Sequence, residues 1–130
     1  MAKEPLVDPE IRAGEELLKA LDKAGLIVRT AFWFYQPDAE QWRFVVATPV
    51  VDNSGPTAAY VEVLKALRSL VSEDAKISPS DISVVSPGSE LPRLISAAIH
   101  TGPESSAPMR FRANTVNGVY IDDAIVYRSS

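Results

Sequence analysis

The sequence predicts one α+β domain, in which a mostly antiparallel sheet of about five strands packs with three helices, mainly on one face. Three observations predict this class. The chain has 130 residues, which is the usual size of a single domain. Apolar residues recur at helical spacing in separate segments of the chain. Hairpin patterns occur in the first half and again at the end, and together they predict the order α-β-β-α-β-α-β-β.

The first predicted helix covers about residues 9–24, after residues 1–7, which we expect to be a flexible arm. Asp8 precedes Pro9, a pattern typical of a helix N-cap followed by proline in the first turn. Gly25 is a natural C-terminal stop. The residues on the buried face of this helix are Ile11, Gly14, Leu17, Leu18 and Leu21.

A hairpin follows this helix. Residues 26–35 are β-branched and aromatic, Gln36–Ala39 has turn composition around Pro37, and Gln41–Val50 returns as an antiparallel strand. Residues 52–55 are expected to form a loop.

The second helix begins at Pro56, and its apolar stripe is the clearest in the chain. The stripe consists of Tyr60, Val63, Leu64, Leu67, Leu70 and Val71. Ser78 and Asp81 have capping-box spacing and predict a single capped turn. The short strand Ile82–Val85 follows, and because helices flank it, it can pair in parallel with a neighbour.

The third helix begins within residues 86–90 and ends before Gly102 and Pro103. Its apolar stripe is Leu91, Leu94, Ile95, Ala98 and Ile99. His100 falls in its expected last turn, where the helix dipole favours a cationic or polar side chain. Residues 102–108 have the composition of a flexible loop.

The chain ends in a second hairpin, Met109–Val116 and Val119–Arg128, around Asn117-Gly118. This dipeptide predicts a type I′ turn, which pairs Val116 with Val119. Counting back places Arg112 opposite Asp123 as a cross-strand ion pair. One face is predicted to carry Met109, Phe111, Ala113, Tyr120, Ala124 and Val126. The other is predicted to carry Arg110, Arg112, Asn114, Ile121, Asp123, Ile125 and Tyr127.

Composition excludes several classes of protein. With no cysteine and one histidine, the chain contains no disulfide, thiolate zinc site or multi-histidine metal site, and we expect no metal or cofactor. Thirteen basic and 17 acidic residues give a net charge of −4, which makes nucleic acid an unlikely partner. No stretch is apolar enough to span a membrane, and the first residues contain no export signal, so we expect a cytoplasmic protein.

The first hairpin is apolar on both faces, whereas a sheet covered on one side alternates apolar and polar residues. Three helices mainly on one face leave the other face uncovered. The expected exposed set is Trp33, Tyr35, Trp42 and Phe44, with Arg29 beside it, and an exposed aromatic patch is typical of an interface. Three explanations stay open: one helix crosses over or the sheet curls, a partner or second copy covers the face, or the aromatics line a small-molecule pocket.

Few residues point to chemistry. Ser86, Gly88 and Ser89 precede a helix and have free amides that can hold an anion, although capping alone also explains them. Asp122 and Asp123 are adjacent in a strand, so their side chains diverge unless a bulge is present. The predicted strands carry Arg29, Arg43, Arg110 and Arg112, which beside aromatic residues could form a ligand-facing surface for phosphate, carboxylate or single-stranded nucleic acid; scattered solvated arginines are the alternative. The chain shows no catalytic constellation.

The resulting hypothesis is a non-catalytic interaction or assembly module that self-associates through the aromatic sheet face or binds one protein partner. The alternative is a small-molecule or anion-binding protein, or a small enzyme, with its site between that face and Ser86–Ser89. A third possibility is a subunit of a larger assembly.

Overall fold

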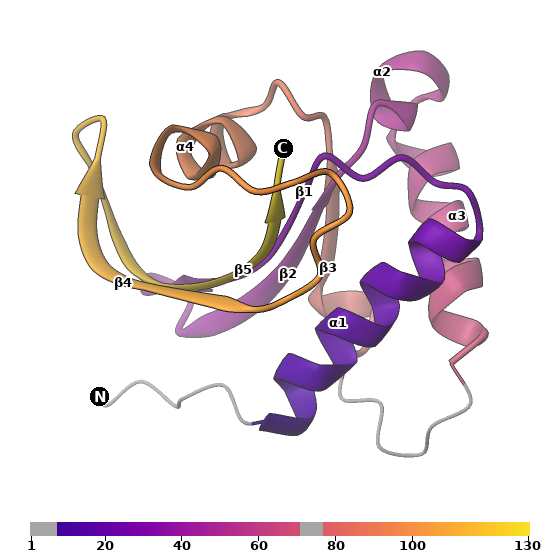
Figure 1. The fold of residues 1–130 in the computed structure, drawn as a ribbon, viewed down its shortest axis with the longest axis horizontal. Coiled ribbons are helices and arrows are strands. Elements are labelled where there is room, and N and C mark those ends of the chain that lie inside the picture. The colour runs from indigo at the N-terminus through magenta and orange to yellow at the C-terminus, as the bar shows by residue number, and fades with distance from the viewer. Residues whose placement is uncertain (1–7, 71–76) are drawn as a thin grey trace.

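A computed structural model describes residues 8–70 and 77–130, and it confirms the α+β class (Figure 1). The expected arm at residues 1–7 and the stripe residue Val71 lie outside the described residues. The elements are α1 (Asp8–Lys23), β1 (Thr30–Gln36), β2 (Gln41–Ala47), α2 (Val50–Ser54), α3 (Pro56–Arg68), the 3-10 turn η1 (Pro79–Asp81), β3 (Ile82–Val85), α4 (Glu90–Ala98), β4 (Met109–Val116) and β5 (Val119–Ser129).

The five strands form one mixed sheet in the order β3-β2-β1-β5-β4. Neighbours pair antiparallel except β2 and β3, which pair in parallel, the arrangement that the helices flanking β3 allow. In the first hairpin Gln36 pairs with Gln41, as the turn predicts. In the last hairpin Val116 pairs with Val119 and Arg112 with Asp123, also as predicted.

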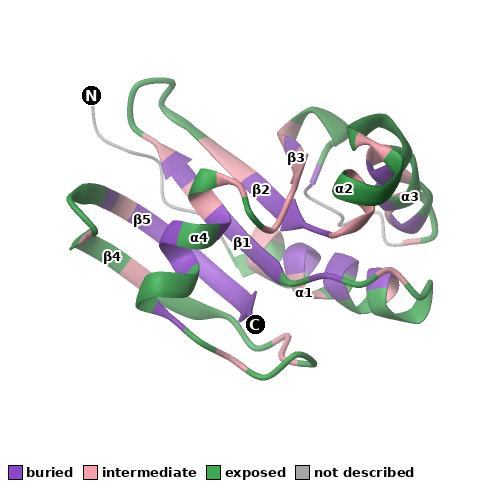
Figure 2. Cartoon of the chain, turned by 90° about the horizontal axis from the view of Figure 1, so that it is seen from above, coloured by how far each residue is buried: buried purple, intermediate pink, exposed green. Residues whose placement is uncertain are grey.

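Helices cover both faces of the sheet. α1 and α3 pack on one face and bury a cluster that contains Leu17, Val46 and Val63. α4 packs on the opposite face and buries a second cluster that contains Phe32, Val45 and Ile95 (Figures 1 and 2). Two of the three predicted helices therefore share a face, and the third crosses to the other, which explains why the first hairpin is apolar on both sides.

Several boundaries differ from the predictions. Gly25 (φ 82°) ends α1 in a Schellman motif, with Gly25 N–H bonded to Asp22 O and Leu26 N–H to Leu21 O. Residues 26–29 are irregular and β1 begins at Thr30, because this motif turns the chain before the strand starts.

The second strand and third helix are shorter than predicted. β2 ends at Ala47 rather than Val50, because Pro49 is the N-cap of the short helix α2, which occupies most of the expected loop. α4 ends at Ala98, and Ile99 has extended dihedrals, so exposed His100 lies outside the helix rather than in its last turn.

A β-bulge in β5 brings two successive residues of the C-terminal strand into contact with α1. The register between β1 and β5 shifts between Ala31 and Phe32, where Tyr127 is the extra residue. Consequently Tyr127 and Arg128 both point toward α1: the Tyr127 hydroxyl donates to Ile11 O at 2.5 Å, and the Arg128 guanidinium binds Asp22 at 2.7 and 2.9 Å.

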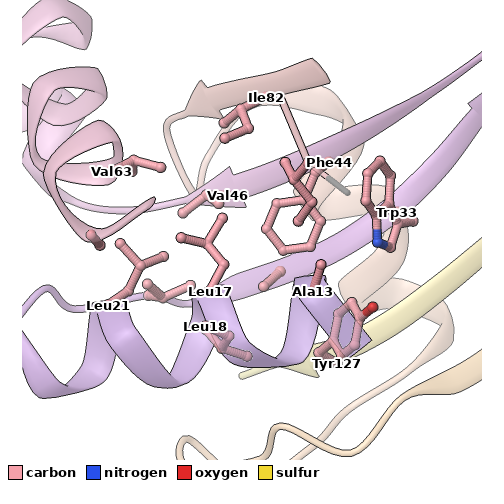
Figure 3. Close-up of a cluster of buried hydrophobic side chains, with 14 of the residues drawn as sticks. Ala13, Leu17, Leu18, Leu21, Trp33, Phe44, Val46, Val63, Ile82 and Tyr127 are labelled. Atoms are coloured by element: carbon pink, nitrogen blue, oxygen red, sulfur yellow. The ribbon is translucent and has the colours of Figure 1, made fainter. Parts of the chain in front are cut away.

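The Tyr127 ring occupies the space that Gly14 leaves on α1 (Figure 3 shows the ring beside this helix, Phe44 and Trp33). Burial raises the pKa of the Tyr127 hydroxyl well above its ordinary value, and the nearby Trp33 indole N–H opposes part of that rise. The Trp33 nitrogen has no partner at hydrogen-bonding geometry, although Figure 3 shows it on the Tyr127 side of the ring.

A second irregularity bends the last hairpin. Ala113 has φ 50°, and the alternation of faces restarts beyond it. Phe111 and Val116 therefore pack on the same cluster, and so do Ala124 and Ile121. The prediction that Ile121 shares a face with Ile125 is wrong for this reason. Beyond Ala113 the hairpin curves up around α4 (Figure 1).

Candidate functional site

The aromatic set of the first hairpin is covered from within the chain. Trp33 is 1% exposed, Phe44 is fully buried and Tyr35 is 6% exposed, while Trp42 is half-buried. Their rings pack in cross-strand pairs: Trp33 and Phe44 meet edge to face with ring centroids 5.2 Å apart, and Tyr35 and Trp42 are tilted with centroids 5.4 Å apart. The expected exposure of Trp33 and Tyr35 is wrong, because α1 packs against this face while α4 takes the other. Arg29 is exposed, in the segment before β1.

The second predicted site, Ser86, Gly88 and Ser89, forms a turn that leads into α4. Gly88 N–H donates to Ser86 Oγ at 3.2 Å, and Ser89 Oγ donates to Ser86 O at 2.5 Å. Ser89 is the N-cap residue, but its side chain makes no capping hydrogen bond to the helix. The hydroxyl groups therefore stabilise the turn itself, and the side chain of Ser89 leaves the first amides of α4 uncapped.

A hollow of about 200 Å³ lies beside this turn, between the start of α4 and the sheet face that carries Phe34. Its apolar wall comes from β1, β2, β3 and α4, namely Phe34, Val45, Val85, Leu91 and Pro92. Its polar wall is Gln36, Arg43, Ser83 and Ser89. The sequence alternative placed a ligand between the sheet face that carries Trp33 and Ser86–Ser89. In the structure these two lie on opposite sides of the sheet, and the hollow lies between the turn and the face that carries Phe34.

Among the described residues that line this hollow, Arg43 is the one charged side chain, and its position is fixed by β3 and by the turn η1 before it. Nε donates to Ser83 Oγ at 2.8 Å, Nη1 to Ser80 O at 3.0 Å and Nη2 to Ile82 O at 3.1 Å. A guanidinium has five N–H donors, so three bonds leave capacity on both Nη atoms. No carboxylate of the described residues lines the hollow, so its polar wall carries a positive charge beside the apolar wall.

A second hollow of about 420 Å³ continues outward from the first. The two share Phe34, Gln36 and Leu91, and the outer one reaches the β1–β2 turn and carries the carboxylates Asp38 and Glu90. A third, open hollow of about 700 Å³ lies on the other side of α4, against Asn117 and Val119 of the last turn. α4 thus occupies the concave face of the sheet without filling it.

Two buried charges elsewhere are paired with opposite charges. Asp123 is fully buried and accepts two hydrogen bonds from Arg110, at 2.8 and 2.6 Å, while Arg112 lies 3.8 Å away. The predicted pair with Arg112 exists, but the diagonal Arg110 makes the bidentate contact. Arg128 is 2% exposed and also donates to Ser105 O at 3.0 Å. Both ion pairs connect elements of the fold, and neither faces the hollows beside α4.

Within residues 8–70 and 77–130, no group of three or more potential metal ligands is placed to hold an ion. None of the helices in this part of the chain has the length and apolar character that crossing a bilayer requires. Phe34 and Val45 were not predicted to face a ligand, and Arg43 was considered only as one of four strand arginines that could form a ligand-facing surface. The available signal was Arg43, the one charged side chain on an otherwise apolar strand face.

Comparison with known proteins gives this chain no relative from which to transfer a role: no family model matches it, and neither the curated proteins nor the solved structures show a significant match. The site's own geometry therefore carries the functional conclusion.

Proposed function

We propose that this protein binds a small molecule with an apolar ring or branched body and one anionic end, in the hollow beside the start of α4. The observation that carries the proposal is Arg43 at the wall of an apolar hollow that no carboxylate lines. Ligand sites in proteins commonly combine such an apolar wall with a few polar groups that orient the ligand.

Size supports a ligand with a single ring. An engineered apolar cavity of about 150 Å³ holds benzene, so the 200 Å³ of this hollow accommodates one ring with a small substituent. The ring would contact Phe34, Val45 and Leu91. The anionic end would accept hydrogen bonds from the remaining Nη donors of Arg43, whose bonds to η1 and β3 hold the guanidinium in place.

The interaction hypothesis rested on exposed aromatics, and the burial of Trp33 and Tyr35 removes that premise. Self-association stays a prediction, and so does the cytoplasmic location.

Three matched ring compounds test the proposal: benzoate, benzyl alcohol and benzylammonium, titrated against the ¹⁵N-labelled protein by NMR. Benzoate should shift amide signals around Phe34, Val85 and Leu91 and bind more tightly than the neutral and cationic probes. At about 0.5 kcal/mol for each of roughly nine heavy atoms, its Kd is on the order of 1 mM.

If a larger side chain fills the hollow, the protein should no longer bind benzoate. Val85→Phe places a ring in the hollow and should abolish the benzoate shifts. Val61→Phe makes the same change on α3, where Val61 is 44% exposed and away from the hollow, and should leave binding intact. Equal binding by Val85→Phe and Val61→Phe would place the ligand elsewhere, and equal binding of benzoate and benzylammonium would refute the anion preference.

A further inference from the structure

The two edge strands of the sheet differ in length and in how far their residues are buried. β3 forms one edge with four residues, all buried or half-buried. β4 forms the other with eight residues, of which only Phe111 and Val116 are half-buried and the rest are exposed. An edge strand presents unpaired backbone N–H and C=O groups along its outer side, and these are available to an added strand.

The backbone at Ala113 limits how much of the β4 edge can pair with an added strand. Its φ of 50° lies outside the strand region, so a regular ladder can run along residues 109–112 but not through 113. Along this stretch Met109 and Phe111 point to the α4 face, and Arg110 and Arg112 point to the opposite face, where Asp123 lies.

Of the two arginines on this face, Arg112 is the more exposed and the more loosely paired. Asp123 is held by two short bonds from Arg110, whereas Arg112 is 3.8 Å away and 58% exposed. The stretch therefore offers a cation on one face and apolar groups, including the 49% exposed Met109, on the other.

A second copy of β4 does not fit this edge. Antiparallel pairing about a twofold axis at residue 111 sets Arg110 opposite Arg112 of the copy, and an axis at 112 sets two Arg112 side chains opposite each other. Like charges directly opposite are destabilising. An axis at 113 requires ladder pairing through Ala113, whose backbone is not in the strand region.

We propose that residues 109–112 of β4 receive an extended segment of a partner protein in which carboxylate and apolar side chains alternate. Added as a sixth strand, such a segment places a carboxylate beside Arg112 and apolar side chains beside Met109 and Phe111. Backbone pairing supplies affinity, and the alternating side chains supply specificity.

Two acetylated, amidated hexapeptides test this proposal, one alternating glutamate with valine and the other lysine with valine. The acidic peptide should slow amide exchange within residues 109–112 and shift their NMR signals, and it should bind about tenfold more tightly than the basic peptide. Amides around the α4 hollow should not respond, which separates this test from that of the ligand site.

Variants of Arg112 test whether its charge causes the preference for the acidic peptide. Arg112→Glu should reverse the preference for the two peptides, and Arg112→Gln, which adds no negative charge beside Asp123, should remove it. Arg12→Glu makes the same charge reversal on an exposed position of α1 and should change nothing. Equal binding of both peptides, or no response in 109–112, would overturn the proposal. So would peptide-free protection of these amides in a species that light scattering shows to be a dimer, because the occupant would then be a second copy.

Discussion

Replacing Gly14 by alanine tests the closest contact between α1 and the sheet. An added Cβ would lie 2.5 Å from Oη and 2.8 Å from Cζ of Tyr127, and 3.0 Å from Cε1 of Phe44. Optimal carbon contacts are about 3.5–4.0 Å. The Tyr127 side chain is fully buried and hydrogen-bonded to Ile11 O on the same helix, so its ring has no open direction in which to move.

The expected magnitude follows from three contributions. Alanine favours a helix interior over glycine by about 1 kcal/mol. Overpacking a core costs about 1–3 kcal/mol, and loss of the Tyr127–Ile11 hydrogen bond costs about 1 kcal/mol more. Gly14→Ala should therefore lower the free energy of unfolding by about 1–3 kcal/mol, the opposite sign to helix propensity alone.

Urea unfolding followed by tryptophan fluorescence measures this change. Tyr127→Phe is the matched background, because it removes the atom closest to the new methyl group. In that background the alanine substitution should cost about 1 kcal/mol less, which a double-mutant cycle resolves. A Gly14→Ala protein as stable as the parent, or more stable, would refute the reasoning.

Two further predictions concern buried polar groups. Burial raises the pKa of Tyr127 above its ordinary value of 10.0. Above about pH 10 the tyrosine therefore loses its proton in the unfolded chain while it keeps it in the folded protein. The free energy of unfolding then falls as pH rises, by up to about 1.4 kcal/mol per pH unit. Tyr127→Phe should lack this contribution in urea unfolding, and equal slopes in the two proteins would contradict it. Asp22→Asn should lower the free energy of unfolding by about 3 kcal/mol, because it leaves the 2% exposed guanidinium of Arg128 without its counter-ion. Arg128→Met removes that buried charge and should cost about 1–2 kcal/mol, because Ser105 O loses its donor; an Asp22→Asn protein as stable as Arg128→Met in thermal unfolding would contradict this order.

Turns and caps that form within a few residues were predicted from the residue types at those positions. Asn117 and Gly118 both have positive φ, 50° and 80°, as a type I′ turn requires, and the register of the last hairpin follows from that turn. Ser78 and Asp81 form the capping box that their spacing indicates. These features are set within a few residues, so sequence reasoning reaches them.

Features that depend on distant contacts were not predictable. The bulge at Tyr127 places its side chain against α1, and the positive φ of Ala113 interrupts the last hairpin, and neither has a local signature. The stripe of α4 predicted a helix but not the face that it covers. The two-sided apolar pattern around Trp33 predicted burial on both faces and left three explanations open, and the structure shows the one in which a helix of the chain, α4, crosses to the second face.

The candidate ligand site was predicted only in part. Ser89 and the start of α4 were identified from the strand–turn–helix pattern, and they do line the hollow. Phe34 was not singled out, and Arg43 was considered only together with three other strand arginines, because the space beside these two residues exists only once α4 has docked on the curved sheet. Cavities arise from the fit between packed elements, which no local pattern records.

The position of β5 has a consequence for synthesis on the ribosome. β5 follows the other strands along the chain but lies inside the sheet, between β1 and β4. Its contacts to α1 close very long loops: Tyr127 and Ile11 are 116 residues apart, and Arg128 and Asp22 are 106 apart. Long-range closure slows folding. While the chain emerges, the edge of β1 and the apolar stripe of α1 lack the contacts that β5 supplies. We therefore expect the nascent protein to bind chaperones until β5 inserts.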